Sequence, residues 1–353
     1  FYTGYVQVHK QGYWDEQILD NGFERSAETE KRILTSYNVS GVSGRLESFA
    51  LASSGDLTKG CLVLGIDPEK ENRITLLKSR MVSGSYLNDA DQSVLLSAGL
   101  AARLKLDVND TLVLIGQGYH GATAAGKYAI KGIVKFGSPE LNDKSLFMPL
   151  SLAQELYGAR NILTSYVLAL KDPDELQLTA ASVKRSLGGA FEVMTWEEIL
   201  PDVKQHIEAD TNNMKYVQGI LYMLICFGIF GTLLMMMVER RLEMGMLVAI
   251  GMKKSRLVIL LLFESVFTVL TGCLLGILAS IPLVYYFNRH PLRMSGETAR
   301  AYERFGFEPI FPTSVSPGNF IDQGLIVLII GLILSLYPMY KIIRLDPVKA
   351  MKR

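Results

Sequence analysis

Three long apolar segments occupy the C-terminal part of the chain. Residues 217–238 (VQGILYMLICFGIFGTLLMMMV) are 22 residues without a charged side chain, and a helix needs about 20 apolar residues to cross a hydrocarbon core of about 30 Å. Residues 257–287 contain one charged side chain, Glu264, and a third charge-free run at 324–340 is extended to 321–343 by flanking isoleucines. We predict a transmembrane helix over each of 217–238, 257–287 and 321–343.

Residues 1–200 have a different pattern, in which short alternating runs are mixed with short amphipathic ones. Strands are expected at 4–9, 60–66, 93–96, 111–115, 128–136 and 165–170, and helices at 26–37, 98–104, 150–157 and 174–187. Strands and helices do not alternate regularly, so the pattern predicts an α+β domain rather than a doubly wound sheet.

A polar helical pattern begins at Trp196 and reaches the first apolar segment without a Gly/Pro-rich linker. We predict a stalk helix over residues 201–216 that continues into the span, with Pro201 starting or bending it because proline cannot donate a backbone hydrogen bond. A continuous helix would transmit motion between the membrane and the domain at residues 1–200, whereas a flexible linker would absorb it.

Charge is distributed unevenly between the two parts. Residues 1–215 carry a net charge of −5 and residues 216–353 a net charge of +6, which nearly cancel to +1 overall. The connection at 239–256 and the end of the chain each hold five basic side chains, and basic flanks mark the cytoplasmic side of a span. We therefore place 239–256 and the tail 344–353 in the cytoplasm, and the proline-containing loop 288–320 outside.

This orientation makes residues 1–200 an extracytoplasmic domain of a multi-pass membrane protein. The sequence given shows no apolar segment before Phe1 that could translocate such a domain. We expect an upstream signal or anchor helix, and an anchor would bring the number of spans to four.

Several chemical functions are disfavoured by the polar residues. The three cysteines and four histidines are scattered, so they predict neither a disulfide framework nor a metal site, and no basic, aromatic-rich face predicts nucleic-acid binding. Residues 121–127 (GATAAGK) match the start of a phosphate-binding loop, but Tyr128 stands where Ser or Thr is needed and opens an alternating run. A hairpin loop of small residues is the better interpretation, and we expect neither a catalytic site nor a bound cofactor in this chain.

The charged and small residues of the spans have structural and functional interpretations. Glu264 is a carboxylate within an apolar run, which is a default sign of function in membranes. It lies about two turns into its span, so pairing with Lys254, Arg256 or a neighbouring helix is a better explanation than transport chemistry. Gly272 and Gly276 form a GxxxG pattern that allows close helix approach, although such spacing is frequent by chance.

The connection at 239–256 (ERRLEMGMLVAIGMKKSR) combines charges with an apolar face. One interpretation is a loop whose charges only fix topology. The other, which its apolar face favours, is a short amphipathic helix at the membrane interface that is available to a cytosolic partner.

At this connection the sequence resembles the permeases of the MacB, LolC/LolE and FtsX superfamily of ABC transporters. The residues that carry the resemblance are Arg240, Arg241, Glu243, Gly245, Ala249 and Gly251, then Lys253, Lys254 and Arg256, then Glu264. A second motif follows the outward loop, with Tyr337-Pro338, Arg344 and Asp346-Pro347 through Ala350. Residues 4–9, 94–97, 100–101 and 195–196 are also similar to the external domain of this family.

The resemblance implies a four-helix, multi-pass permease of the bacterial inner (cytoplasmic) membrane, with its large domain periplasmic or extracellular. It also implies that the permease works as a dimer with a second copy or a paralogue. It implies cytosolic ABC ATPase subunits or domains that bind ATP and Mg²⁺, and a coupling helix formed by Arg240, Arg241, Glu243, Gly245, Ala249 and Gly251. It also implies an external domain with an inserted subdomain, which we place at residues 50–160.

Lipoprotein release from the inner membrane, as by LolC/LolE, is the function expected first. Alternatives are MacB-like efflux of drugs or peptides from the periplasm and FtsX-like regulation of a cell-wall hydrolase, although the large external domain argues against the latter. In the family's lipoprotein exporters a hairpin contacts a soluble carrier, and residues 117–127 lie at a comparable place in this chain. A periplasmic carrier or adaptor is therefore a further expected partner.

Overall fold

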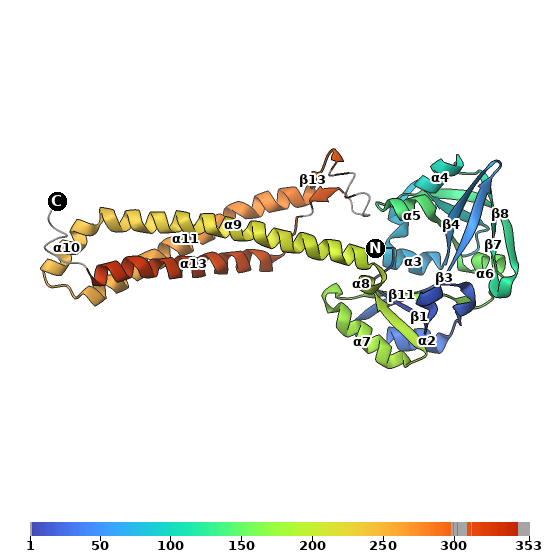
Figure 1. The fold of residues 1–353 in the computed structure, drawn as a ribbon, viewed down its shortest axis with the longest axis horizontal. Helices are drawn as coiled ribbons and strands as arrows, with labels where there is room; N and C mark the ends of the chain where they lie inside the picture. Colours follow the sequence, from blue (N-terminus) through green and yellow to red (C-terminus); the bar gives the residue numbers. More distant parts are fainter. Residues whose placement is uncertain (1, 298, 300–301, 303–308, 312, 345–353) are drawn as a thin grey trace. The chain divides into compact units, whose positions relative to one another are not determined.

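The computed structural model describes residues 2–297, 299, 302, 309–311 and 313–344. The chain divides into two compact units, of which the first holds residues 1–205 with 295–309 and the second holds residues 206–294 with 310–353. Figure 1 shows that strands and short helices build the first unit, and that long helices build the second.

The first unit is an α+β domain. Its strands are β1 (Val6–Lys10), β2 (Phe23–Glu24), β3 (Val39–Ser54), β4 (Leu57–Ile66), β5 (Met81–Gly84), β6 (Ser93–Ser97), β7 (Thr111–Gln117), β8 (Thr123–Val134), β9 (Ser145–Pro149), β10 (Ile162–Leu163), β11 (Ser165–Leu170) and β12 (Phe191–Thr195). Its α-helices are α1 (Tyr13–Glu16), α2 (Ala27–Leu34), α3 (Pro68–Thr75), α4 (Ala98–Leu104), α5 (Pro139–Lys144), α6 (Leu150–Leu156), α7 (Leu176–Leu187) and α8 (Trp196–Ile199). Single 3-10 turns lie at η1 (Leu19–Asn21), η2 (Leu77–Arg80), η3 (Tyr119–Gly121) and η4 (Pro173–Glu175).

Part of the main sheet closes on itself. The sheet has 10 strands in the order β12-β1-β11-β3-β4-β9-β6-β8-β5, and β7 pairs with both β3 and β8. The strands β3, β4, β9, β6, β8 and β7 therefore form a closed ring, and closure removes the unpaired edges that would otherwise invite association. Buried side chains of one core cluster alternate along these strands and fill the ring: Ala50, Ala52, Val63, Val94, Leu96, Leu112, Leu114 and Leu146.

The sequence pattern does not predict β3, a strand of 16 residues. Its buried positions 50 and 52 are Ala, and a Cβ atom on Gly44 would come within 2.8 Å of Leu163 Cδ1. Small residues fit these crowded positions, but they weaken the apolar alternation from which strands are predicted. The boundary predicted for an insert at residue 50 falls inside this strand.

The prediction of a hairpin loop at residues 121–127 is wrong for most of its length. Strand β8 begins at Thr123, and Lys127 pairs with Val113 of β7. The reversal is confined to residues 118–122, where the Gly118 amide donates to the Ala122 carbonyl at 2.6 Å. A paired strand does not offer the helix N-terminus that holds phosphate, which removes the phosphate-loop interpretation.

A buried ion pair joins β3 to α3. Arg45 has no exposed surface and Glu71 is 1% exposed. The Arg45 guanidinium donates through Nε to Glu71 Oε2 at 3.0 Å and through Nη2 to Glu71 Oε1 at 2.6 Å. Nη2 also donates to the Tyr2 carbonyl at 2.7 Å, so this bidentate pair fixes the N-terminal segment as well.

The second unit contains the apolar helices. Its elements are α9 (Pro201–Glu239, which begins in the first unit), α10 (Arg241–Ala249), α11 (Lys254–Arg289), β13 (Leu292–Arg293), β14 (Ile310–Phe311) and α13 (Pro317–Ile343). Within the described residues α9, α11 and α13 are long and apolar enough to cross a membrane. Of the predicted tail 344–353, the part from Asp346-Pro347 to Ala350 that carries the second motif lies outside the described residues.

The stalk and the first span form one helix. Leu200 has non-helical dihedral angles, and α9 starts at Pro201, where the missing amide hydrogen costs nothing because first-turn donors have no partner within a helix. The helix then runs for 39 residues to Glu239. A continuous helix of this length can carry displacement along its axis.

Candidate functional site

Most of the predicted coupling residues lie on α10, which has 9 residues and connects α9 to α11. Met244 and Gly245 are buried, whereas Arg241, Glu243 and Ala249 are exposed. The helix therefore has an inner face that packs against its own chain and an outer face that does not. Gly245 belongs to the inner face and is buried within its own chain.

The inner face of α10 is held by an apolar cluster. Met244 packs with Leu257 and Leu261 of α11 and with Ile342 of α13, and each is at most 4% exposed. The cluster gathers residues from three helices at the end of the bundle where α10 lies (Figure 1). The cluster therefore joins α10 to both α11 and α13.

The outer face of α10 is apolar with charged flanks. Leu242, Met246 and Ile250 are 50%, 43% and 85% exposed, and Arg241 and Glu243 are exposed beside them. Exposed apolar side chains rimmed by charge are typical of a protein interface. These three apolar residues are ones from which the sequence predicted the apolar face, together with Leu247, which is 37% exposed.

Gly251 ends α10. Its φ of +105° is a conformation that favours glycine. The Met252 amide donates to the Leu247 carbonyl at 3.0 Å and the Gly251 amide to the Val248 carbonyl at 3.1 Å, which is the hydrogen-bond pattern of a Schellman cap. The glycine thus turns the chain from α10 toward α11.

An ion pair connects the junction of α9 and α10 to α11. Arg240 Nη1 lies 2.5 Å from Glu264 Oε1. The backbone of Arg240 belongs to both helices, because its amide donates to Met236 of α9 and its carbonyl accepts from Met244 of α10. Glu264 thus has a structural partner at the junction of two neighbouring helices, which agrees with the predicted pairing with a neighbouring helix.

The start of α11 is also tied to the end of α13. Lys254 Nζ donates to the Ile343 carbonyl at 3.1 Å. A lysine at this point stabilises carbonyl groups that have no partner at the C-terminus of a helix. The bond adds a polar contact beside the apolar cluster.

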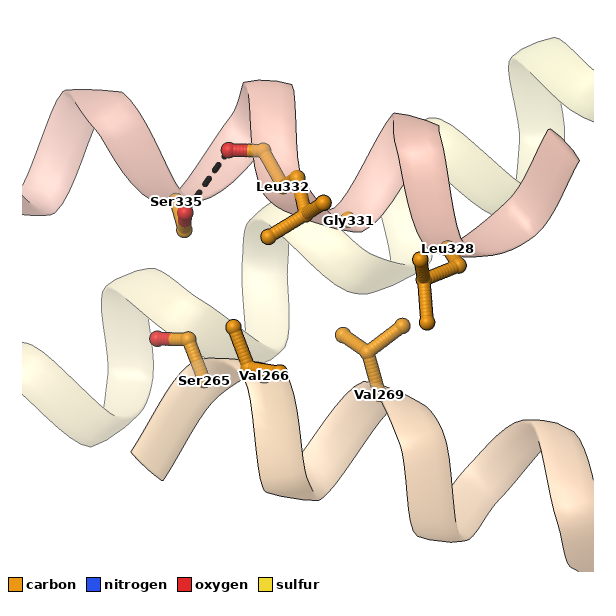
Figure 2. Close-up of a pocket in the computed structure, with 7 residues that line it drawn as sticks. All are labelled: Ser265, Val266, Val269, Leu328, Gly331, Leu332 and Ser335. Atoms are coloured by element: carbon orange, nitrogen blue, oxygen red, sulfur yellow. Dashed lines mark hydrogen bonds between the residues drawn. The ribbon is translucent and has the colours of Figure 1, made fainter. Parts of the chain in front are cut away.

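The α11–α13 interface is closely packed at Gly331. A Cβ atom on Gly331 would lie 2.7 Å from Val269 Cγ2 and 2.8 Å from Val269 Cγ1. Figure 2 shows the residues around this crossing, where a cavity of about 10 Å³ has room for about one water molecule. Ser335 satisfies its hydroxyl within α13 by donating to the Leu332 carbonyl at 2.7 Å. The two helices form one rigid pair.

The GxxxG pattern of α11 does not make a close helix contact among the described residues. A Cβ atom on Gly272 or Gly276 would meet nothing within 4 Å. Both glycines instead line a groove of about 650 Å³ that also takes side chains from α9 and α13. Close approach is achieved by Gly331, which the sequence did not single out.

Helix α9 meets the α11–α13 pair at separate points around this groove. The Tyr222 hydroxyl donates to Gln323 Oε1 at 2.5 Å, and the rings of Phe230 and Tyr337 lie 5.3 Å apart. Tyr222 lies near the start of the apolar segment 217–238 of α9, and Arg240 lies just after its end. The interface of α9 is therefore looser than that between α11 and α13.

The predicted carrier-binding hairpin is tied to its own domain at the turn. The Tyr119 amide donates to the Tyr157 carbonyl at 2.8 Å, and the His120 amide donates to Asp20 Oδ1 at 2.7 Å. A turn held by these bonds does not project freely from the domain. The β3–β4 turn at Gly55 and Asp56 is exposed and makes a second candidate contact.

A closed α+β domain followed by three apolar helices and a short connecting helix defines a membrane permease. Residues 3–186 match the MacB-like periplasmic core domain, and residues 217–347 match the FtsX-like permease C-terminal domain. The chain belongs to the MacB/LolC/FtsX superfamily of ABC transporter permeases. The family and fold class predicted from the sequence are confirmed.

Similar proteins include both lipoprotein and macrolide transporters. The lipoprotein-releasing system transmembrane protein LolC of Xylella fastidiosa is 22% identical over 335 residues, which cover 90% of this chain and 79% of LolC. The macrolide export ATP-binding/permease protein MacB of Agrobacterium fabrum is 27% identical over 126 residues, 36% of this chain and 17% of MacB. The periplasmic region of MacB from Actinobacillus actinomycetemcomitans has a TM-score of 0.39 at 14% identity, covering 58% of this chain and 93% of that structure.

The family fixes the location of both units. The chain is an inner-membrane protein with a periplasmic domain, as the flanking charges predict. Since α9 leads from that domain across the membrane, α10 lies on the cytoplasmic side. Relatives of this class are ABC permeases, which work with ATPase partners.

Proposed function

We propose that this chain converts ATP hydrolysis by a cytosolic ABC ATPase into movement of its periplasmic domain. ATP and Mg²⁺ bind to the ATPase, and the permease contributes no catalytic residue. The support is mechanical, because α10 contacts α11 and α13 through Met244 and is joined to the 39-residue helix α9 at Arg240. The functional unit is a dimer with a second copy or a paralogue.

The exposed face of α10 is the proposed contact with the ATPase. Leu242, Met246 and Ile250 supply apolar area, and the Arg241 and Glu243 charges set the docking angle. Gly251 fixes where the helix ends. Ala249 is exposed and small, which permits close approach of a partner.

The cargo we propose is a lipoprotein released from the inner membrane. One observation carries this proposal: the match to LolC extends over 90% of this chain, through both the periplasmic and the membrane unit. Efflux of drugs or peptides is the second candidate, favoured by the match of residues 3–186 to the MacB-like periplasmic core domain.

Depletion of the protein in its own cells distinguishes the two cargoes. Lipoprotein release predicts that outer-membrane lipoproteins accumulate in the inner-membrane fraction after depletion, with drug tolerance unchanged. Efflux predicts correct sorting together with altered tolerance to drugs or peptides. Correct sorting after complete depletion would refute the lipoprotein proposal.

A further inference from the structure

The contacts of α9 divide the membrane unit into one rigid pair and one looser helix. Gly331 lets α11 and α13 pack closely, with Val269 filling the contact. Helix α9 is separated from that pair by the groove of about 650 Å³ along part of its length. A closely packed interface resists sliding, whereas an open groove lets a helix shift without displacing interlocked side chains.

Among the described residues, polar contacts hold α9 to the pair near each end of the apolar span, and they differ in strength. At the periplasmic end the Tyr222 hydroxyl makes a neutral hydrogen bond to Gln323. At the cytoplasmic end Arg240 and Glu264 carry opposite charges 2.5 Å apart. A charge-assisted bond is about twice as strong as a neutral one.

We propose that the Arg240–Glu264 ion pair is the pivot about which α9 turns against the α11–α13 pair. The proposal rests on the proposed function, since it specifies how movement of α10 reaches the periplasmic domain. Arg240 and Glu264 are positioning residues in this scheme. The ion pair keeps the cytoplasmic end of α9 in place, and the groove gives the periplasmic end room to move.

The position of Arg240 explains why a pivot there would transmit force. Its amide completes the hydrogen bonding of α9 and its carbonyl starts that of α10. A push on α10 therefore acts on α9 at the residue that is fixed to Glu264. Because the ion pair fixes the cytoplasmic end of α9, a tilt of α10 becomes a tilt of α9. Without the ion pair, α9 would slide along the α11–α13 pair and would not tilt.

The experiment measures the movement of α9 in the full-length permease, purified with its ATPase and reconstituted in lipid. Spin labels at Tyr216 on α9 and Ile321 on α13, both exposed, report the distance between the periplasmic ends of these helices. The native cysteines are replaced, and the distance is compared without nucleotide and with ATP, Mg²⁺ and vanadate. The variants are Arg240→Glu, Glu264→Arg and the double exchange.

We expect an ATP-dependent change of this distance in the parent protein, its loss in each single variant, and its return in the double exchange. Arg289→Glu reverses a charge at the far end of α11 and serves as the matched control that keeps the change. If the distance change returns in the double exchange, the ion pair itself is required. A structural defect caused by either single substitution would not be repaired by exchanging the two charges.

Two results would overturn the proposal in distinguishable ways. No ATP-dependent change in the parent protein would refute the proposed function and the pivot with it. A change in the parent that persists in both single variants would refute the pivot alone. If charge reversal prevents membrane insertion, Arg240→Gln and Glu264→Gln replace those variants, and movement like that of the parent in both again refutes the pivot.

Discussion

The Gly331 contact predicts a large effect from the addition of one methyl group. A Cβ atom there would sit 2.7 and 2.8 Å from the two Cγ atoms of Val269, whereas carbon atoms at optimal contact are about 3.5–4.0 Å apart. Either α13 or the valine must move by nearly 1 Å. We expect Gly331→Ala to destabilise the membrane unit by about 1–3 kcal/mol, against a gain in helix propensity of about 1 kcal/mol.

Thermal unfolding of the full-length protein in detergent, followed with a thiol-reactive dye, measures this change. In a Cys61→Ala background the remaining cysteines, Cys226 and Cys273, both lie in the membrane unit and report its unfolding. Gly272→Ala is the matched control, because a Cβ atom at that helical position meets nothing within 4 Å. We expect the control to unfold at the same temperature or higher.

The cause is tested by shrinking the opposing side chain. Val269→Ala removes both Cγ atoms that crowd residue 331, so the double variant with Gly331→Ala should be more stable than the sum of the single effects. The expected coupling is about 1 kcal/mol or more. Additive effects, or a Gly331→Ala protein as stable as the Gly272→Ala control, would show that α11 and α13 are not closely packed there.

Three further predictions concern other parts of the chain. Glu71→Gln should destabilise the periplasmic domain by about 1.5–3 kcal/mol, because it removes the charge of the bidentate partner of buried Arg45 and leaves Glu47, at 3.4 Å, as the remaining carboxylate. Urea unfolding by tryptophan fluorescence measures it, as Trp14 and Trp196 both lie in that domain, and an unchanged midpoint would contradict it. Burial lowers the pKa of His9 from its usual 6.5, so the unfolded domain binds more protons than the folded one. The free energy of unfolding, measured by urea titration at several pH values, should therefore fall as the pH decreases through 6.5. A His9→Gln variant with the same pH dependence would show that His9 is not its cause. Gly251→Val should lower co-purification of the ATPase, since a β-branched residue at φ +105° is strained and shifts the end of α10. The control Gly219→Val, at an open position of α9, should leave co-purification unchanged. Equal recovery of the ATPase with both variants would argue against a role of the Gly251 cap in docking.

The membrane unit was largely predictable because span length and flanking charge are local properties of the sequence. The contacts between the spans were not. The sequence directed attention to Gly272 and Gly276, which line a groove, and not to Gly331, whose role depends on the facing Val269. It suggested Lys254, Arg256 or a neighbouring helix as the partner of Glu264, but it could not identify Arg240, which precedes α10 in the chain whereas Glu264 follows it.

The periplasmic domain shows the complementary limit. Strands with clear alternation such as β7 and β11 were expected near their observed positions. Strand β3 was missed because Ala50 and Ala52 are buried in the ring and Gly44 faces Leu163 of β10, and such small residues weaken the apolar alternation. Ring closure depends on β7 pairing with residues 50–53 of that missed strand. Pairing between distant strands leaves no local periodic signal, so the topology could not be derived from the pattern alone.

The two faces of α10 separate two requirements of a coupling helix. Its outer residues can change to suit a particular ATPase without disturbing the permease, because Leu242, Met246 and Ile250 contact little of their own chain. Its inner residues cannot, because Met244 contacts α11 and α13 at once and Gly245 is buried beside it. Substitutions on the outer face should therefore affect ATPase binding before they affect the fold, whereas those on the inner face should affect both together. If the segment were a loop that only fixed topology, substitutions on its two faces would have the same effect. Only the number of its charges would then matter, and not their positions.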